Sequence, residues 1–254
     1  MEFKNWIIEE SAKPKEYQGN KIVYVDSKKF RSSSLENEEF CTIAVHEDFP
    51  KSIKNNEIWI DNNIKNHEIP ELLKGVSARL KMLSKKKDSE KAYDHGLKKE
   101  KDVRKNNPLS IKPKKYCVLN DSKGKINVYF VSGEAVRDRH KTDFSQGGHG
   151  YVYNWISKSE IWLEEEEKDE AAFILAHEYA EMILMRDRKM SYENAHPIAS
   201  KIEKELRDKG FTYNAICCKL GVSKGTVSYH CGKGVKERQH ERQMAPREDF
   251  LWKR

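Results

Sequence analysis

The chain has 254 residues, 37% of them apolar and 35% charged, with a formal net charge of +7 and a mean hydropathy of −0.89. This composition supports modest hydrophobic cores, while no apolar run approaches the roughly eighteen residues of a membrane span and the N-terminus lacks the apolar core of a signal peptide. The five cysteines are scattered and odd in number, so we expect no disulfide framework and predict a cytoplasmic protein with no membrane partner.

The N-terminal part of the chain predicts a small unit of strands followed by helices. Strands are expected at 21–25, 42–45 and 57–60. The spacing of apolar residues then becomes helical, which predicts helices near 68–84 and 88–105. The segment 106–115 contains two prolines and several lysines and is expected to be a linker, either a solvated basic loop or a strap that contacts phosphates.

A similar succession follows in the second half of the chain. Strands are expected at 126–131, 150–154 and 160–163. The glycine pair 147–148 is expected to form a loop before the second of these strands. Residues 171–185 have helical spacing, and Ser191 caps a second helix that ends near Asp208.

The two halves resemble each other at a constant offset. The tetrapeptide EIWI at 57–60 returns as EIWL at 160–163, an offset of 103 residues. The offset persists through the helices that follow, and His46 falls opposite His149. The matching pairs include Leu72 and Leu175, Met82 and Met185, Lys86 and Lys189, Ala92 and Ala195, Glu100 and Glu203, and Arg104 and Arg207. We therefore predict a tandem duplication.

These elements predict the α+β class, with two tandem copies of a small β-meander plus two-helix unit followed by an all-α helix–turn–helix domain. The expected domains are 1–105, the basic linker 106–115, 116–208 and 209–254. Trp59 and Trp162 hold matching places in the two copies, so we expect both to anchor a core between sheet and helix.

The most specific local pattern is FTYNAICCKLGVSKGTVSYHC, residues 211–231. A short helix that ends near Leu220 is stopped by Gly221, which accepts a left-handed conformation at little cost. Val222 then fills the angle between two helices, and Ser223 caps the second one. The residues expected to contact DNA are Ser223, Lys224, Thr226, Ser228, Tyr229, His230, Lys233 and Lys236.

The sequence Leu-Gly-Val-Ser followed by Thr-Val-Ser resembles the helix–turn–helix of small repressors, resolvases and the DNA-reading segments attached to some phage homing nucleases. The resemblance covers about residues 205–243. It implies that the second helix enters the major groove of double-stranded DNA, and that the protein is a homodimer, because one recognition helix reads too few base pairs for high affinity. The plainer alternative is a helical hairpin on the protein surface.

The second copy carries a chemical pattern at the hexapeptide AHEYAE. His177 and Glu181 are four residues apart, so both project from one face of a helix, with Glu178 beside that face. His196, on the following antiparallel helix, would complete three protein ligands for zinc and leave Glu178 to act as general base. His149, flanked by glycines, is a further candidate ligand.

This motif resembles the HExxH pattern of zinc metallopeptidases, in which a glutamate inside the helix activates water and a later helix supplies the third ligand. Glu181 stands in place of the second histidine of that pattern. The resemblance implies a zinc-dependent hydrolase that acts on peptides. Such domains sometimes accompany helix–turn–helix modules that bind DNA.

The first copy has none of these polar residues. Lys74, Gly75, Ala78 and Tyr93 stand where the second copy has His177, Glu178, Glu181 and His196. This difference is expected if one copy carries a site and the other is a scaffold. The alternative is drift between two surfaces, with Glu178 and Glu181 facing solvent and a histidine hydrogen-bonded to a carboxylate.

Three functions follow from these patterns. The first is a DNA-binding regulator or accessory factor of a phage or mobile element, whose duplicated region dimerises or binds a protein partner. The second is a zinc-dependent, peptidase-like hydrolase that is targeted to DNA. The third is a phage-type inhibitor without catalytic activity, which binds a host protein and represses its own promoter.

Replacing Lys224 with alanine is expected to weaken DNA binding, because one cationic contact with a phosphate is lost. Substitutions at Thr226, Ser228 or Tyr229 are expected to change which DNA sequence is preferred, because these side chains face outward. Fluorescence anisotropy with a labelled duplex measures both effects. Equal DNA affinity of the full chain and of a chain that ends at Asp208 would contradict the assignment.

Overall fold

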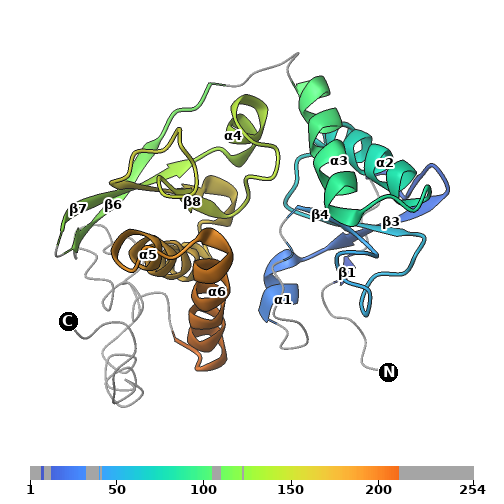
Figure 1. Ribbon diagram of the computed structural model, residues 1–254. Helices are drawn as coiled ribbons and strands as arrows, with labels where there is room; N and C mark the ends of the chain where they lie inside the picture. Colours follow the sequence, from blue (N-terminus) through green and yellow to red (C-terminus); the bar gives the residue numbers. More distant parts are fainter. Residues whose placement is uncertain are drawn as a thin grey trace. The chain divides into compact units, whose positions relative to one another are not determined.

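The computed structural model describes residues 7–8, 13–32, 40, 42–104, 110–121 and 123–211 (Figure 1). The described part is mixed α+β, with two sheets and six α-helices, which confirms the predicted class. The predicted helix–turn–helix, with all eight of its DNA-contact candidates, lies outside the described residues, as does part of the predicted linker.

The chain divides into two compact units. The first contains residues 1–112 and 131–146, and the second contains residues 113–130 and 147–254. The short segment 131–146 therefore belongs to the first unit, although the residues on either side of it in sequence belong to the second.

The sheet of the first unit has the order β1-β3-β5-β4, with β2 paired to β3. Its strands are β1 (Ile7–Ile8), β2 (Glu16–Tyr17), β3 (Asn20–Val25), β4 (Ile43–Val45) and β5 (Glu57–Asp61). β3 and β5 are parallel, whereas β4 runs antiparallel to β5 at the edge. The predicted β-meander is therefore wrong here, because parallel neighbours require a crossover connection and not a hairpin.

Four helices belong to the first unit. They are α1 (Ser27–Ser32), α2 (Ile69–Leu83), α3 (Ser89–Arg104) and α4 (Gly133–Arg139). The period of two along the strands divides the core between the sheet's faces: Ile58 and Ile60 pack in the cluster that contains Leu72 of α2. Trp59 points the other way, and its ring lies 5.7 Å from that of Phe30 on α1. The prediction that Trp59 is a core residue is confirmed.

The second unit repeats this layout with a second sheet and a helical pair. Its strands are β6 (Lys114–Asp121), β7 (Gly124–Val131), β8 (Gly147–His149) and β9 (Glu160–Glu164), in the order β6-β7-β9-β8. A 3-10 turn (Glu165–Glu167) leads to α5 (Ala171–Asp187) and α6 (Tyr192–Asp208). α5 packs against β8, β9 and α6, and one core cluster joins residues of the sheet to residues of both helices.

The expected strand at 150–154 is wrong, because the strand lies at 147–149 and the following residues form turns. The sequence predicts a loop at the glycine pair because glycine is depleted in strands. Tertiary packing favours glycine here, because a Cβ on Gly147 would lie 3.1 Å from both Glu178 Oε1 and Ile174 Cγ2, which is tighter than an ordinary contact.

Several details recur in both units at the predicted offset. Both sheets place the last strand in sequence between its two predecessors. Trp59 and Trp162 each donate a hydrogen bond from Nε1 to the glutamate two residues earlier. Lys86 and Lys189 both have a positive φ, 54° and 56°, just after the first helix of each pair. The tandem duplication itself stays a prediction.

Asp121, at the end of β6, connects the β6–β7 hairpin to α5. It accepts a hydrogen bond from the Tyr179 hydroxyl at 2.7 Å and pairs with Arg186 at 3.0 Å. Burial alone would raise the pKa of Asp121, but the hydrogen bonds from Lys123 N–H, Tyr179 and Arg186 lower it. Asp121→Asn is expected to reduce the free energy of unfolding by about 1–3 kcal/mol in urea denaturation, because two partners lose a charged acceptor.

The pH dependence of this contribution has a definite sign. The contribution of Asp121 is complete above its unfolded-state pKa of about 3.9 and disappears as the pH falls through the lower folded-state pKa. Asp102→Asn on α3 is the control, because its ion pair with Lys99 is exposed and contributes about 0.5 kcal/mol or less. Equal losses in the two variants would contradict the anchoring role.

Candidate metal centre

Six histidine and glutamate residues of the second unit converge where β8, α5 and α6 meet. They are His149 on β8, His177, Glu178 and Glu181 on α5, and His196 and Glu203 on α6. Most of α5 is buried, because it packs against β8 and β9 as well as α6. Polar side chains on this helix are therefore held inside the unit, where each needs a partner.

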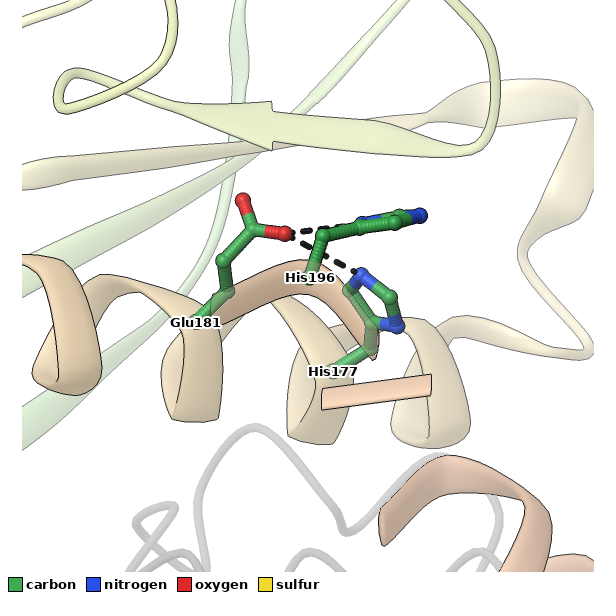
Figure 2. Close-up of side chains that lie close together, drawn as sticks. All are labelled: His177, Glu181 and His196. Atoms are coloured by element: carbon green, nitrogen blue, oxygen red, sulfur yellow. Dashed lines mark hydrogen bonds and ion pairs between the residues drawn. The ribbon is translucent and has the colours of Figure 1, made fainter. Parts of the chain in front are cut away.

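The Glu181 carboxylate is the centre of the group. Its Oε2 lies 2.8 Å from His196 Nδ1 and 3.6 Å from His177 Nε2 (Figure 2). Its Oε1 lies 3.1 Å from His149 Nε2. Three imidazoles therefore surround one carboxylate, and they come from three different elements of the fold.

The alternative in which the two motif glutamates face solvent is wrong. Glu181 is 2% exposed and Glu178 is 8% exposed, because α5 is covered by both the sheet and α6. Burial alone would raise the pKa of Glu181, but hydrogen bonding to His149, His177 and His196 outweighs it and holds the pKa well below its usual range. Glu181 is therefore an anion at neutral pH.

His177 is oriented from behind by a second carboxylate. Its Nδ1 lies 3.2 Å from Glu203 Oε2, within ion-pair distance but without a well-aligned hydrogen bond, while the other ring nitrogen, Nε2, lies 3.6 Å from Glu181 Oε2. Glu203 Oε1 in turn accepts hydrogen bonds from Arg207 at 2.7 and 3.0 Å. Burial opposes ionisation of Glu203, but His177 and Arg207 lower its pKa to about 2. A carboxylate on the far nitrogen is the usual partner of a metal-binding histidine.

The spacing of the ligand atoms fits one metal ion. The ligand atoms of His177, Glu181 and His196 all lie within 4.8 Å of one another. Two atoms bound to one zinc ion at about 2.0–2.1 Å with tetrahedral angles are about 3.3 Å apart. The distances of 2.8 and 3.6 Å from Glu181 lie on either side of that value. A shift of about half an ångström would bring each of these two distances to ligand spacing.

Glu178 lies next to this ligand group and opposite the strand. Glu178, Glu181 and His149 form a second group whose ligand atoms lie within 4.8 Å of one another. A Cβ on Gly147 would lie 3.1 Å from Glu178 Oε1, so the backbone of β8 lies close to the Glu178 carboxylate.

The group is most open at the start of α6. The side chain of His196 is 32% exposed, against 6% or less for His149, His177 and Glu181. The Tyr192 ring stacks on the His196 imidazole, with centroids 4.9 Å apart and an angle of 27° between the planes. Tyr192 is itself 41% exposed, so a molecule that approaches from solvent meets this pair first.

The corresponding place in the first unit is filled by close helix packing. A Cβ on Gly75 would lie 3.0 Å from the carbonyl oxygen of Gly96, so α2 and α3 approach backbone to backbone where α5 carries Glu178. The ion pair of Glu100 with Arg104 matches that of Glu203 with Arg207 at the offset of 103. The glutamate–arginine pair thus occurs in both units, whereas the histidine group occurs in one.

The structure brings together all five predicted chemical residues of the second copy: His149, His177, Glu178, Glu181 and His196. The sequence interpretation missed the role of Glu203. Its spacing of four residues from Arg207 on one helical face was the available signal, because a buried glutamate beside an arginine can orient a histidine.

Comparison of the chain with protein-family models, with curated proteins and with solved structures gave no match. Within the described ranges, none of the helices combines the length and the apolar character needed to cross a bilayer. A functional conclusion therefore depends on the chemistry of the site.

Proposed function

We propose that the second unit is a zinc-dependent hydrolase. The observation that supports this most directly is the buried Glu181 carboxylate between His177 and His196, with His177 oriented by Glu203. Two imidazoles and one carboxylate form a donor set that catalytic zinc sites use, and such sites leave a fourth position for water or substrate. The partial exposure of His196 gives that position access from solvent.

Glu178 is the general base in this proposal. Bound zinc would polarise the scissile carbonyl group and make a water molecule more acidic. The Glu178 carboxylate takes a proton from the attacking water, whose oxygen bonds to the carbonyl carbon. The proton then passes to the leaving nitrogen as the carbon–nitrogen bond breaks. Burial beneath β8 keeps Glu178 away from bulk solvent and close to the ligand group.

Peptides are the proposed substrate class. The sequence His-Glu-x-x-Glu with a later helix histidine resembles the arrangement of zinc metallopeptidases, with Glu181 in place of one histidine. The duplicated frame supports the assignment, because the first unit packs α2 against α3 with Ala78 and Gly75 at the equivalent places. We propose that the first unit is a scaffold derived from the same ancestor.

The purified chain is expected to contain about one zinc ion, and His177→Ala is expected to lose it, because a ligand is removed. Inductively coupled plasma mass spectrometry on untagged protein measures the metal content. His67→Ala is the matched control, since His67 pairs with Glu134 in the first unit. Absence of zinc from the wild type after incubation with the metal, or its retention in His177→Ala, would overturn the proposal.

Glu178→Gln is expected to keep the zinc and to lower kcat for peptide hydrolysis by about two to four orders of magnitude, because an amide cannot accept the proton from water. Cleavage of a fluorescence-quenched peptide library measures the rate. Glu71→Gln on α2 of the first unit serves as the control. A Glu178→Gln variant that cleaves at the wild-type rate would exclude Glu178 as the base.

A second function is carried by a separate part of the sequence. We propose that residues 211–231 bind double-stranded DNA, on the strength of the Gly221 turn and the Ser223 cap described above. The two functions are compatible in one chain, as a DNA-targeted hydrolase or as a regulator with a duplicated partner-binding region. A chain that ends at Asp208 should keep its zinc and lose its DNA affinity.

A further inference from the structure

We infer that His149 is a positioning residue for Glu181 and that the site holds one metal ion. In this arrangement, which rests on the proposed zinc site, the His149 Nε2–H donates to Glu181 Oε1 and leaves Oε2 for the metal. The contrasting arrangement makes His149 a ligand of a second metal ion, because His149, Glu178 and Glu181 also form a ligand-sized group. The hydrogen bonding of His149 distinguishes these two arrangements.

The tautomer of His149 is determined by the contact of Nδ1, the ring nitrogen that does not face Glu181. The backbone N–H of Tyr151 points at His149 Nδ1, with the two nitrogens 3.2 Å apart. Nδ1 must therefore offer its lone pair, and in the neutral ring the proton lies on Nε2. A metal ion on Nε2 would require the proton on Nδ1, where it would face the proton of Tyr151. The neutral histidine is thus a donor toward Glu181 and a poor ligand.

The place of His149 is fixed by the strand that carries it. Its side chain is fully buried, and His149 is in register with Ile161 in the β8–β9 pair. Nε2 has no well-aligned hydrogen bond within the described structure, and it lies 3.1 Å from Glu181 Oε1.

The two oxygens of Glu181 already divide their partners. Oε2 faces His177 and His196, whereas Oε1 faces His149. A donor on Oε1 favours a carboxylate that binds the metal through one oxygen. Such outer partners typically strengthen metal binding by about 10–100-fold.

The first unit provides an internal control for this role. His46 corresponds to His149, but its Nδ1 lies 2.6 Å from the carbonyl oxygen of Ile53 and therefore donates. The two histidines thus have opposite hydrogen-bonding roles at Nδ1. Ala78 stands where the second unit has Glu181, so the carboxylate that His149 faces has no counterpart at that position of the first unit.

The experiment compares zinc binding of the wild type, His149→Leu, His149→Gln and His46→Leu by competition with a chromophoric chelator. We expect one zinc per chain in the wild type. His149→Leu should bind zinc about 10–100-fold more weakly with the same stoichiometry. His149→Gln should recover most of the affinity, because an amide N–H can still donate to Glu181 Oε1. His46→Leu should match the wild type.

Each other outcome has a distinct meaning. No zinc in the wild type overturns the proposed function and the role of His149 with it. Two zinc ions in the wild type, with one lost in both His149 variants, make His149 a ligand and overturn only the inference. Equal affinity of His149→Leu and the wild type also overturns it. If circular dichroism shows that His149→Leu does not fold, the wild-type stoichiometry and the zinc binding of His149→Gln still distinguish the two roles. A ligand role predicts two zinc ions in the wild type and the loss of one of them in His149→Gln.

Discussion

A carboxylate buried in the second unit constrains everything around it. An unpaired charge in a protein interior costs several kcal/mol, and Glu181 is only 2% exposed. Three imidazoles around Glu181 offset that cost, and the second nitrogen of one of them, His177 Nδ1, lies 3.2 Å from Glu203. Glu203 is itself buried, and Arg207 balances it. The positions of β8, α5 and α6 are linked through this one series of contacts.

The first unit shows which of these contacts the frame requires. There the glutamate–arginine pair is present as Glu100 and Arg104, and Arg104 also contacts Glu68 and Asp138 in a fully buried network. The glutamate–arginine ion pair is therefore part of the packing of both helix pairs, whether or not histidines are present. Ala78 stands where the second unit has Glu181, and α2 and α3 approach each other closely at Gly75 and Gly96. A group of three imidazoles and two further carboxylates is thus not needed for folding, and its presence in the second unit favours a chemical role.

The helices and the meeting of their histidine and glutamate side chains were predictable from sequence because both depend on local spacing. Residues 177 and 181 share a face in any α-helix, and an antiparallel hairpin returns His196 to that face. The parallel pairing of β3 with β5 and the strand at 147–149 were not predictable in this way. Strand order depends on contacts far apart in sequence, and a Gly-Gly-His strand has no alternating pattern. The role of Glu203 was hidden because its match to Glu100 pointed to a shared structural function.

Glutamate at position 181 gives this site a property that a histidine at the same position would lack. An imidazole bound to metal has one remaining ring nitrogen, which points away from the metal, whereas a carboxylate has a second oxygen beside the first. Glu181 can therefore engage the helix pair through Oε2 and the strand through Oε1. Gly147, two residues before His149, lies close to Glu178 and Ile174 of α5, where a Cβ would be 3.1 Å from both side chains. The glutamate and the glycine-rich strand thus pack as parts of one arrangement, in which the backbone of β8 lies close to α5.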